Sequence, residues 1–221
     1  MENITFKRTE ANSSGQRISA TLYNFIIGLV LCWGFLVNWV MVKTIPYESI
    51  ANINPWIFFI GYFASCFFGI SLFTKSDSPL VSFVGYNFVV VPFGLIINLV
   101  VCQYDPSLVL EAMRVTGLVT FLMMVLGSMF PRFFEKIAGA LTIALLAVII
   151  VELIEMFILK THHGIIDWIV VVIFCGYIGY DWGRANRIPK TVDNAVDSAA
   201  SLYIDIINLF LRILRILGRR R

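Results

Sequence analysis

Charged residues are scarce in this chain of 221 residues. Only 14% are Asp, Glu, Lys or Arg, 59% are hydrophobic, and the formal net charge is +3. Soluble domains carry about a quarter of their residues as charged side chains, so this composition excludes the soluble classes. The small positive charge gives no electrostatic reason to expect a nucleic-acid partner. With no internal repeat or low-complexity segment evident, we expect a single integral membrane domain over residues 1–221.

The chain also lacks the short motifs of common enzymes. It contains neither Gly-x-Ser-x-Gly nor His-Glu-x-x-His, and its last apolar segment has no lysine for a retinal Schiff base. The cysteines lie singly in different apolar segments, without the spacing of a metal or redox pair: Cys32, Cys66, Cys102 and Cys175. We therefore expect no enzymatic activity and no bound cofactor.

Long apolar runs are abundant instead. A helix needs about 20 apolar residues to cross the hydrocarbon core of a bilayer. Seven segments come close to or exceed this length, at about 22–42, 56–74, 80–101, 108–130, 137–159, 165–182 and 198–217. The first has full spanning length and no small-residue cleavage site, so we expect a retained helix and not a signal peptide. The predicted fold class is an all-α membrane protein with a seven-transmembrane helix bundle.

Basic residues beside these spans predict the orientation of the chain in the membrane. Nine lie on the side of the amino terminus: Lys7, Arg8, Arg17, Lys75, Arg132, Lys136, Arg184, Arg187 and Lys190. Three lie on the other side: Lys43, Arg114 and Lys160. We therefore expect a cytosolic amino terminus, with residues 1–20 as a cytosolic tail. The arginines after Gly218 would then lie outside if the last helix crosses completely, or return to the cytosol if it is re-entrant.

A polar stripe runs along the last apolar segment. Its members recur every three or four residues: Asp197, Ser201, Asp205, Asn208, Arg212, Arg215 and Arg219. One interpretation is a helix that lies in the headgroup plane with its arginines on lipid phosphates. The other is a helix inside the bundle, with Ser201, Asn208 and Arg212 lining a polar pore. The acid at Asp205 favours the second interpretation, because interfacial helices normally spread Lys and Arg along the polar face.

The sequence of this stripe resembles the transmembrane Bax-inhibitor-motif family. The similarity lies in Leu202-Tyr203-Ile204-Asp205-Ile206-Ile207-Asn208-Leu209-Phe210, preceded by Tyr180-Asp181 at the end of the previous apolar segment. Weaker similarity is found in Val109-Leu110-Glu111-Ala112, Thr120-Phe121 and Gly127. The resemblance covers the chain from about residue 80 onward. It implies a seven-helix protein of the bacterial inner or plasma membrane with its carboxyl-terminal helix in the centre.

The resemblance also implies a function. In that family the two aspartates form a dyad that closes a pH-sensitive calcium leak path, and these roles fall here to Asp181 and Asp205, with calcium as the transported ion that they bind transiently. Lys75 is the nearest counterpart of the family's basic latch. Spacing agrees, since Asp205 lies about two turns into its helix and could stand level with Asp181 on an antiparallel neighbour. Two carboxylates at low dielectric would share a proton and respond to pH.

Six acids lie on or near the side with few basic residues, and two of them, Glu48 and Asp105, are interpreted as solvated loop acids. The other four are Glu111, Glu152, Glu155 and Asp167, of which Glu152 and Glu155 share one helix face. We expect these carboxylates to attract cations to the outer side.

Two other functional classes deserve comparison with a calcium channel. Intramembrane aspartyl proteases also use two aspartates, but their second one follows Gly-x-Gly, whereas Asp205 follows Leu-Tyr-Ile. The stronger alternative is a non-transporting regulator that binds other membrane proteins and restrains a protease or a cell-death pathway. Asp205 and Asn208 in mid-helix favour transport, because a scaffold has no need of them. The expected partners are the lipid bilayer, calcium ions and protons, and for the alternative other membrane proteins.

Overall fold

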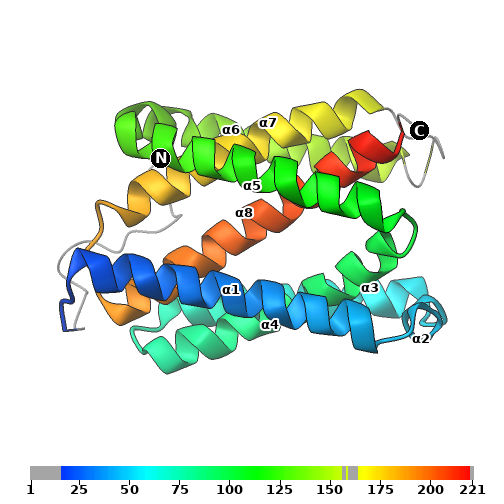
Figure 1. Cartoon of the computed structure of the whole chain (residues 1–221), viewed down its shortest axis with the longest axis horizontal. Coiled ribbons are helices and arrows are strands. Elements are labelled where there is room, and N and C mark those ends of the chain that lie inside the picture. The colour runs from blue at the N-terminus through cyan, green and yellow to red at the C-terminus, as the bar shows by residue number, and fades with distance from the viewer. Residues whose placement is uncertain (1–15, 156–157, 159–163, 220–221) are drawn as a thin grey trace. The chain divides into compact units, whose positions relative to one another are not determined.

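The computed structural model describes residues 16–155, 158 and 164–219, and this part of the chain contains helices and no strands. The helices are α1 (Ala20–Thr44), α2 (Tyr47–Ala51), α3 (Pro55–Lys75), α4 (Pro79–Val101), α5 (Pro106–Met129), α6 (Pro131–Ile154), α7 (Gly164–Ala185) and α8 (Val192–Gly218) (Figure 1). They form two compact units. Unit 1 comprises Met1–Gln103 with Arg187–Tyr203, and unit 2 comprises Tyr104–Asn186 with Ile204–Arg221. The predicted all-α class is confirmed.

Six of the described helices are long and apolar enough to cross a membrane: α1, α3, α4, α5, α6 and α7. Five of them match their predicted spans to within about three residues at each end. The exception is α6, which was expected over 137–159 but begins at Pro131, because proline is well accepted in the first turn of a helix. Residues 156–157 and 159 of that predicted span lie outside the described residues.

The longest of the described helices is α8, which covers 27 residues and begins six residues before the predicted start at 198. It is not among the six apolar helices, because it carries charged side chains along its length: Asp193, Asp197, Asp205, Arg212 and Arg215. Its role as a seventh span, and its place in the centre of a bundle, stay predictions. Its first part belongs to unit 1 and its remainder to unit 2.

Prolines mark where many of the helices begin. Four helices start with proline, at Pro55, Pro79, Pro106 and Pro131. Proline has no N–H to leave unsatisfied there, and its fixed backbone angle suits the first turn. In α3 the preceding Asn54 adds a cap, since its side-chain oxygen accepts a hydrogen bond from the Trp56 N–H at 2.9 Å. These local signals explain why the predicted boundaries are close to the observed ones.

In unit 1, α4 packs against both α3 and α1. The contact with α3 is close at two glycines: a Cβ on Gly69 would lie 2.5 Å from the Gly85 carbonyl oxygen, and a Cβ on Gly85 would lie 2.7 Å from the Gly69 oxygen. Small residues allow such close approach between membrane helices. The first part of α8 contributes Tyr203, whose ring meets those of Tyr86 at 5.3 Å and Phe93 at 6.2 Å edge-on.

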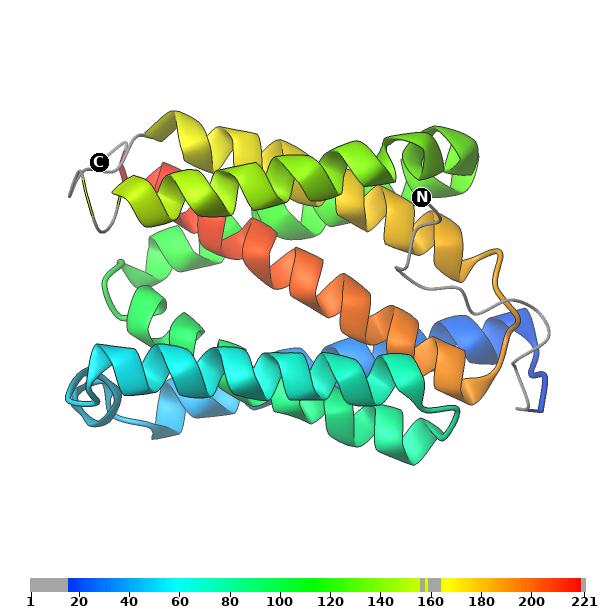
Figure 2. The same ribbon diagram turned by 180° about the vertical axis from the view of Figure 1, so that it is seen from behind.

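In unit 2, α7 packs against both α5 and α6 (Figure 2). A Cβ on Gly127 of α5 would lie 2.3 Å from the Gly179 oxygen, and one on Gly183 would lie 2.9 Å from the Gly127 oxygen. On the α6 side, a Cβ on Gly179 would lie 2.3 Å from the ring of Phe134. Because these glycines have no side chains, the end of α7 packs closely against α5 and α6.

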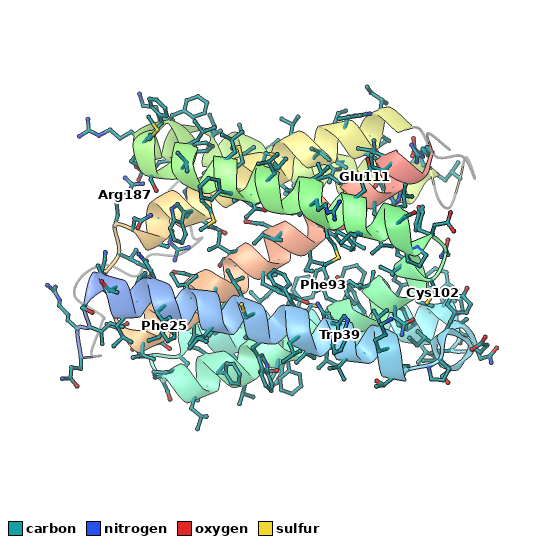
Figure 3. The ribbon with its side chains drawn as sticks, in the orientation of Figure 1. Phe25, Trp39, Phe93, Cys102, Glu111 and Arg187 are labelled. Atoms are coloured by element: carbon teal, nitrogen blue, oxygen red, sulfur yellow. The ribbon has the colours of Figure 1, made fainter. Side chains whose placement is uncertain are left out.

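Large apolar side chains are exposed along the helices. On α1 these include Phe25 at 60% and Trp39 at 61% exposure (Figure 3), and on α6 they include Ile143 at 71%. Soluble proteins rarely leave large contiguous apolar surface in water, whereas lipid covers such surfaces in a membrane. The structure and the composition thus agree on a multi-pass integral membrane protein.

Candidate functional site: an aspartate pair

The aspartates singled out in the sequence come together in unit 2. Asp181 lies one turn before the end of α7, and Asp205 lies in the part of α8 that belongs to the same unit. Their carboxyl groups lie close enough to interact directly. An ionised carboxylate can only accept hydrogen bonds, so a bond between the two carboxyl groups would require a proton on one of them. The structure thus brings together the two acids that a proton-sharing gate needs.

Burial and nearby charges define the setting of this pair. Asp205 is only 6% exposed, and its second carboxyl oxygen has no hydrogen-bond partner in the described part of the chain. Arg184 follows Asp181 by one turn, and its positive charge acts on that carboxyl group. Tyr177 precedes Asp181 by one turn, within electrostatic range of both acids, and its hydroxyl donates to Thr142 Oγ1 at 3.0 Å. The acid pair thus has a cation on one side and a phenol on the other.

The orientation of Asp181 follows from its neighbours on α7. Gly179 faces Phe134 of α6 and Gly183 faces Gly127 of α5. Each lies two residues from Asp181, which on an α-helix directs the Asp181 side chain away from these two neighbours. Next to it, the indole Nε1 of Trp182 donates to Ser128 Oγ of α5 at 2.8 Å. Glycine contacts and the Trp182 bond together hold this end of α7 in place.

The polar residues predicted to line a pore have different surroundings. Ser201 is half-buried in the part of α8 that belongs to unit 1. Asn208 lies in unit 2 and donates from Nδ2 to the Ile204 oxygen of its own helix at 2.8 Å. Arg212 forms ion pairs, described next. A common pore lining for the three stays a prediction.

A charged cluster lies near the start of α7, formed by Asp167, Glu152 and three arginines of α8. Asp167 is fully buried and lies 3.1 Å from Arg212 Nη1, 3.1 Å from Arg215 Nη1 and 3.0 Å from Arg219 Nη2. Arg212 also binds Glu152 of α6 with both nitrogens, and its Nη2 lies 2.9 Å from Oε2. Burying Asp167 would be costly without these partners, since an unpaired buried charge destabilises a fold strongly.

The aspartate pair and the charged cluster fix the course of α8 along α7. At one end Asp205 of α8 meets Asp181 of α7, and at the other end Arg219 of α8 meets Asp167 of α7. The two contacts are fourteen residues apart on each helix. The two helices are therefore antiparallel over about 21 Å, at about 1.5 Å per residue. Tyr104 packs at the last residue of α8, where a Cβ on Gly218 would lie 2.1 Å from its ring. Within this unit the described part of α8 continues to the far end of α7.

The acids predicted to attract cations are distributed unevenly. Glu111 is exposed on α5 (Figure 3), and Glu155 is buried. Glu152 and Asp167 have their charges balanced by arginines of α8. These ion pairs were not predicted from the sequence. The spacing of three or four residues in the polar stripe of α8 predicted only that Arg212, Arg215 and Arg219 share one helix face. Their effect on cations in solution stays a prediction.

Two further expectations remain open at this site. Lys75 is exposed at the end of α3 in unit 1, whereas Asp181 belongs to unit 2, so the proposed latch stays a prediction and Arg184 is the cation that acts on Asp181. Among the described residues, no group of three or more His, Cys, Asp or Glu side chains is arranged to hold a metal ion. Transient binding of calcium by Asp181 and Asp205 likewise stays a prediction.

Comparisons with known proteins agree with the motif. The family described as inhibitor of apoptosis-promoting Bax1 matches residues 16–221. An uncharacterized protein of Helicobacter pylori is 30% identical over 167 residues, which cover 74% of this chain and 71% of the relative. The Bax inhibitor 1 of Schizosaccharomyces pombe is 27% identical over 173 residues, which cover 76% of this chain and 63% of the relative. An uncharacterized membrane protein of Streptococcus pyogenes is 30% identical over 136 residues, which cover 57% of this chain and 58% of the relative. The chain therefore belongs to the Bax inhibitor family of membrane proteins.

Proposed function

We propose that this chain is a pH-sensitive calcium leak channel in which the Asp181–Asp205 pair is the gate. The observation that carries the proposal is the direct approach of two acids from α7 and α8, with Asp205 only 6% exposed, which favours a proton shared between them. Membership of the Bax inhibitor family supports it. The expected localisation is the bacterial inner membrane, with a cytosolic amino terminus.

The gate depends on the protonation state of the pair. With one proton, the hydrogen bond holds α7 and α8 together at this end. Loss of that proton leaves two negative charges face to face, which repel each other strongly at low dielectric. Gain of a second proton removes the negative charge that attracts Arg184. Either change weakens the closed arrangement, so the permeability responds to pH.

Calcium ions suit the oxygen atoms that an opened pair would present. Ca²⁺ prefers several oxygen ligands, carboxylates above all, in flexible geometry. Two aspartates and a few water molecules would bind it weakly enough for release, which conduction requires. At the other end of α7, the acids Glu152 and Asp167 offset the charge of the arginines there. A cation that approaches that end therefore meets less repulsion than three unpaired arginines would produce.

Calcium flux into liposomes that contain only the purified protein tests the proposal. We expect entry of calcium above that of protein-free liposomes, and entry that changes with pH. Parallel liposomes with an unrelated multi-pass membrane protein control for leaks caused by reconstitution. Failure of the parent protein to raise calcium entry at any pH would contradict a channel.

A non-transporting regulator is the second proposal. It is favoured by the printed name of the fission-yeast relative, Bax inhibitor 1, and by the broad apolar faces exposed on α3 and α6. Such faces could bind the helices of another membrane protein. Crosslinking in native membranes distinguishes the two proposals: a regulator gives one reproducible partner and no calcium flux in liposomes, whereas a channel gives flux without a partner.

A further inference from the structure

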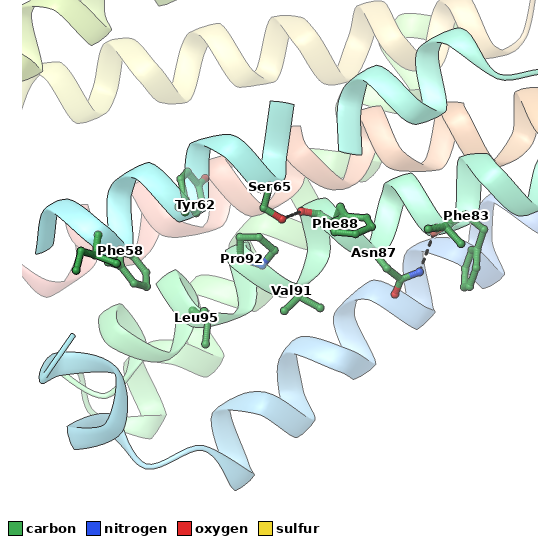
Figure 4. Close-up of a pocket in the computed structure, with 12 residues that line it drawn as sticks. Phe58, Tyr62, Ser65, Phe83, Asn87, Phe88, Val91, Pro92 and Leu95 are labelled. Carbon is green, nitrogen blue, oxygen red and sulfur yellow. Dashed lines mark hydrogen bonds between the residues drawn. The ribbon is translucent and has the colours of Figure 1, made fainter. Parts of the chain in front are cut away.

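A groove lies between α3 and α4 in unit 1 (Figure 4). It encloses about 610 Å³, and its walls include Ile57, Phe58 and Gly61 of α3 and Val84, Val91 and Leu95 of α4. Gly61 helps to leave this space, because a Cβ at that position would meet no atom within 4 Å. The groove opens to the outside of its unit, since Ile57 is 68% and Val91 is 45% exposed.

The polar side chains in the groove wall already have partners. Ser65 Oγ donates to a main-chain oxygen of α4 at 2.7 Å. Asn87 donates to a main-chain oxygen one turn earlier at 2.8 Å and accepts from Trp33 Nε1 at 3.0 Å. Tyr62 is hydrogen-bonded to Cys66. No charged residue lines the groove. An occupant therefore finds little unmet hydrogen-bonding capacity, which suits a hydrocarbon.

The dimensions of the groove identify the kind of hydrocarbon. Along α4 the wall runs from Phe83 to Leu95, twelve residues or about 18 Å, close to one leaflet of a hydrocarbon core about 30 Å thick. An acyl chain in one leaflet runs over about this length, so the groove can hold such a chain along most of its course.

Charged side chains lie beyond one end of the groove. Phe83 lies one turn, about 6 Å, from the start of α4 at Pro79, and the exposed Lys75 and Asp77 lie at the end of α3 and in the connecting loop. A lysine at a membrane interface attracts lipid phosphates. Lys75 and the apolar wall therefore suit the phosphate and the acyl chain of a phospholipid.

We propose that the groove between α3 and α4 binds one acyl chain of a membrane phospholipid, whose phosphate lies at the Lys75 end. The bound chain covers apolar side chains of both helices and fills the space beside Gly61. This site belongs to unit 1 and does not depend on the Asp181–Asp205 gate.

Photolabelling of the full-length protein in vesicles tests this site. The vesicles contain phosphatidylcholine with a small fraction of phosphatidylglycerol that carries a diazirine on one acyl chain. We expect the label on peptides that contain residues 57–65 and 83–95. Gly61→Trp fills the groove and lowers this labelling by about tenfold or more, whereas Gly28→Trp on α1, equally open in the structure, leaves it unchanged. Val91→Trp is a second groove-filling variant, in case Gly61→Trp does not fold.

The following results would overturn the proposal. Equal labelling of the groove and of α6, which does not line it, would indicate ordinary lipid contact. Unchanged labelling in both groove-filling variants would indicate that the lipid lies elsewhere. Absence of labelling, together with crosslinking of Gly61→Cys protein to a second copy, would show that another chain covers the groove.

Discussion

The shared proton proposed for Asp181 and Asp205 would link stability to pH. Aspartates in the unfolded chain are ionised at neutral pH, so on this proposal folding takes up one proton at the pair. Stability then falls as the pH rises, by up to about 1.4 kcal/mol per pH unit. Asp205→Asn supplies an amide that donates to Asp181 without a titrating proton, and should flatten this slope. Unfolding in detergent between about pH 6 and pH 8 measures it, and an equal slope in the variant would contradict a shared proton.

Asp167 is predicted to contribute the most to stability among the acids near the start of α7. Asp167→Asn leaves Arg212, Arg215 and Arg219 with too little negative charge around them. Removal of one member of a buried ion pair costs about 3–5 kcal/mol. Glu111→Gln on the exposed surface of α5 is the control, and should stay within about 0.5 kcal/mol. Equal unfolding midpoints for the two variants would refute a stabilising role for the cluster.

Glu152 is predicted to affect calcium entry more than folding. Glu152→Gln leaves Asp167 alone to balance Arg212, Arg215 and Arg219, and the excess positive charge at this end of α7 repels approaching cations. We expect calcium entry into liposomes to fall several-fold at low salt, and the loss to shrink as added salt screens the charges. Calcium entry that matches the parent at every salt concentration would mean that the acid serves only as a partner for arginine.

At the scale of the helices, the contact between α5 and α7 depends on glycine. Gly127→Leu places a side chain where the Gly179 oxygen lies, and should separate the two helices and displace Asp181. Overpacking of this kind costs about 1–3 kcal/mol or more. Gly117→Leu on the same helix is a matched control, since a Cβ there meets no atom within 4 Å. We expect a lower unfolding midpoint for Gly127→Leu and an unchanged one for Gly117→Leu.

The helices were largely predictable from the sequence, because long apolar runs and prolines are local signals. The same holds for the end of α7 and the stripe of α8, where equal depth on antiparallel neighbours suggested that Asp181 and Asp205 meet. Contacts between distant segments left no such signal. The Ser82 hydroxyl donates to Asp193 at 2.7 Å across 111 residues, and Asp167 pairs with arginines more than 40 residues away. Their geometry depends on packing that periodicity does not encode.

At the scale of the whole molecule, the distribution of basic residues predicts the topology. A reporter fused at Lys75 or Arg132 should be cytosolic, and one at residue 160, outside the described residues, should be external. The antiparallel course of α8 along α7 further predicts that a reporter after the last residue is external. A cytosolic signal from position 160 would overturn the number of spans.

The pH dependence of calcium flux tests the gate most directly. Liposomes with the parent protein, Asp181→Asn or Asp205→Asn are compared from about pH 5 to about pH 8, a range in which ordinary aspartates do not titrate strongly. Both variants remove the shared proton and the repulsion between the acids. We predict that the parent changes its flux across this range, and that each variant folds and conducts with a nearly flat profile. A full pH profile in both single variants would contradict the aspartate gate.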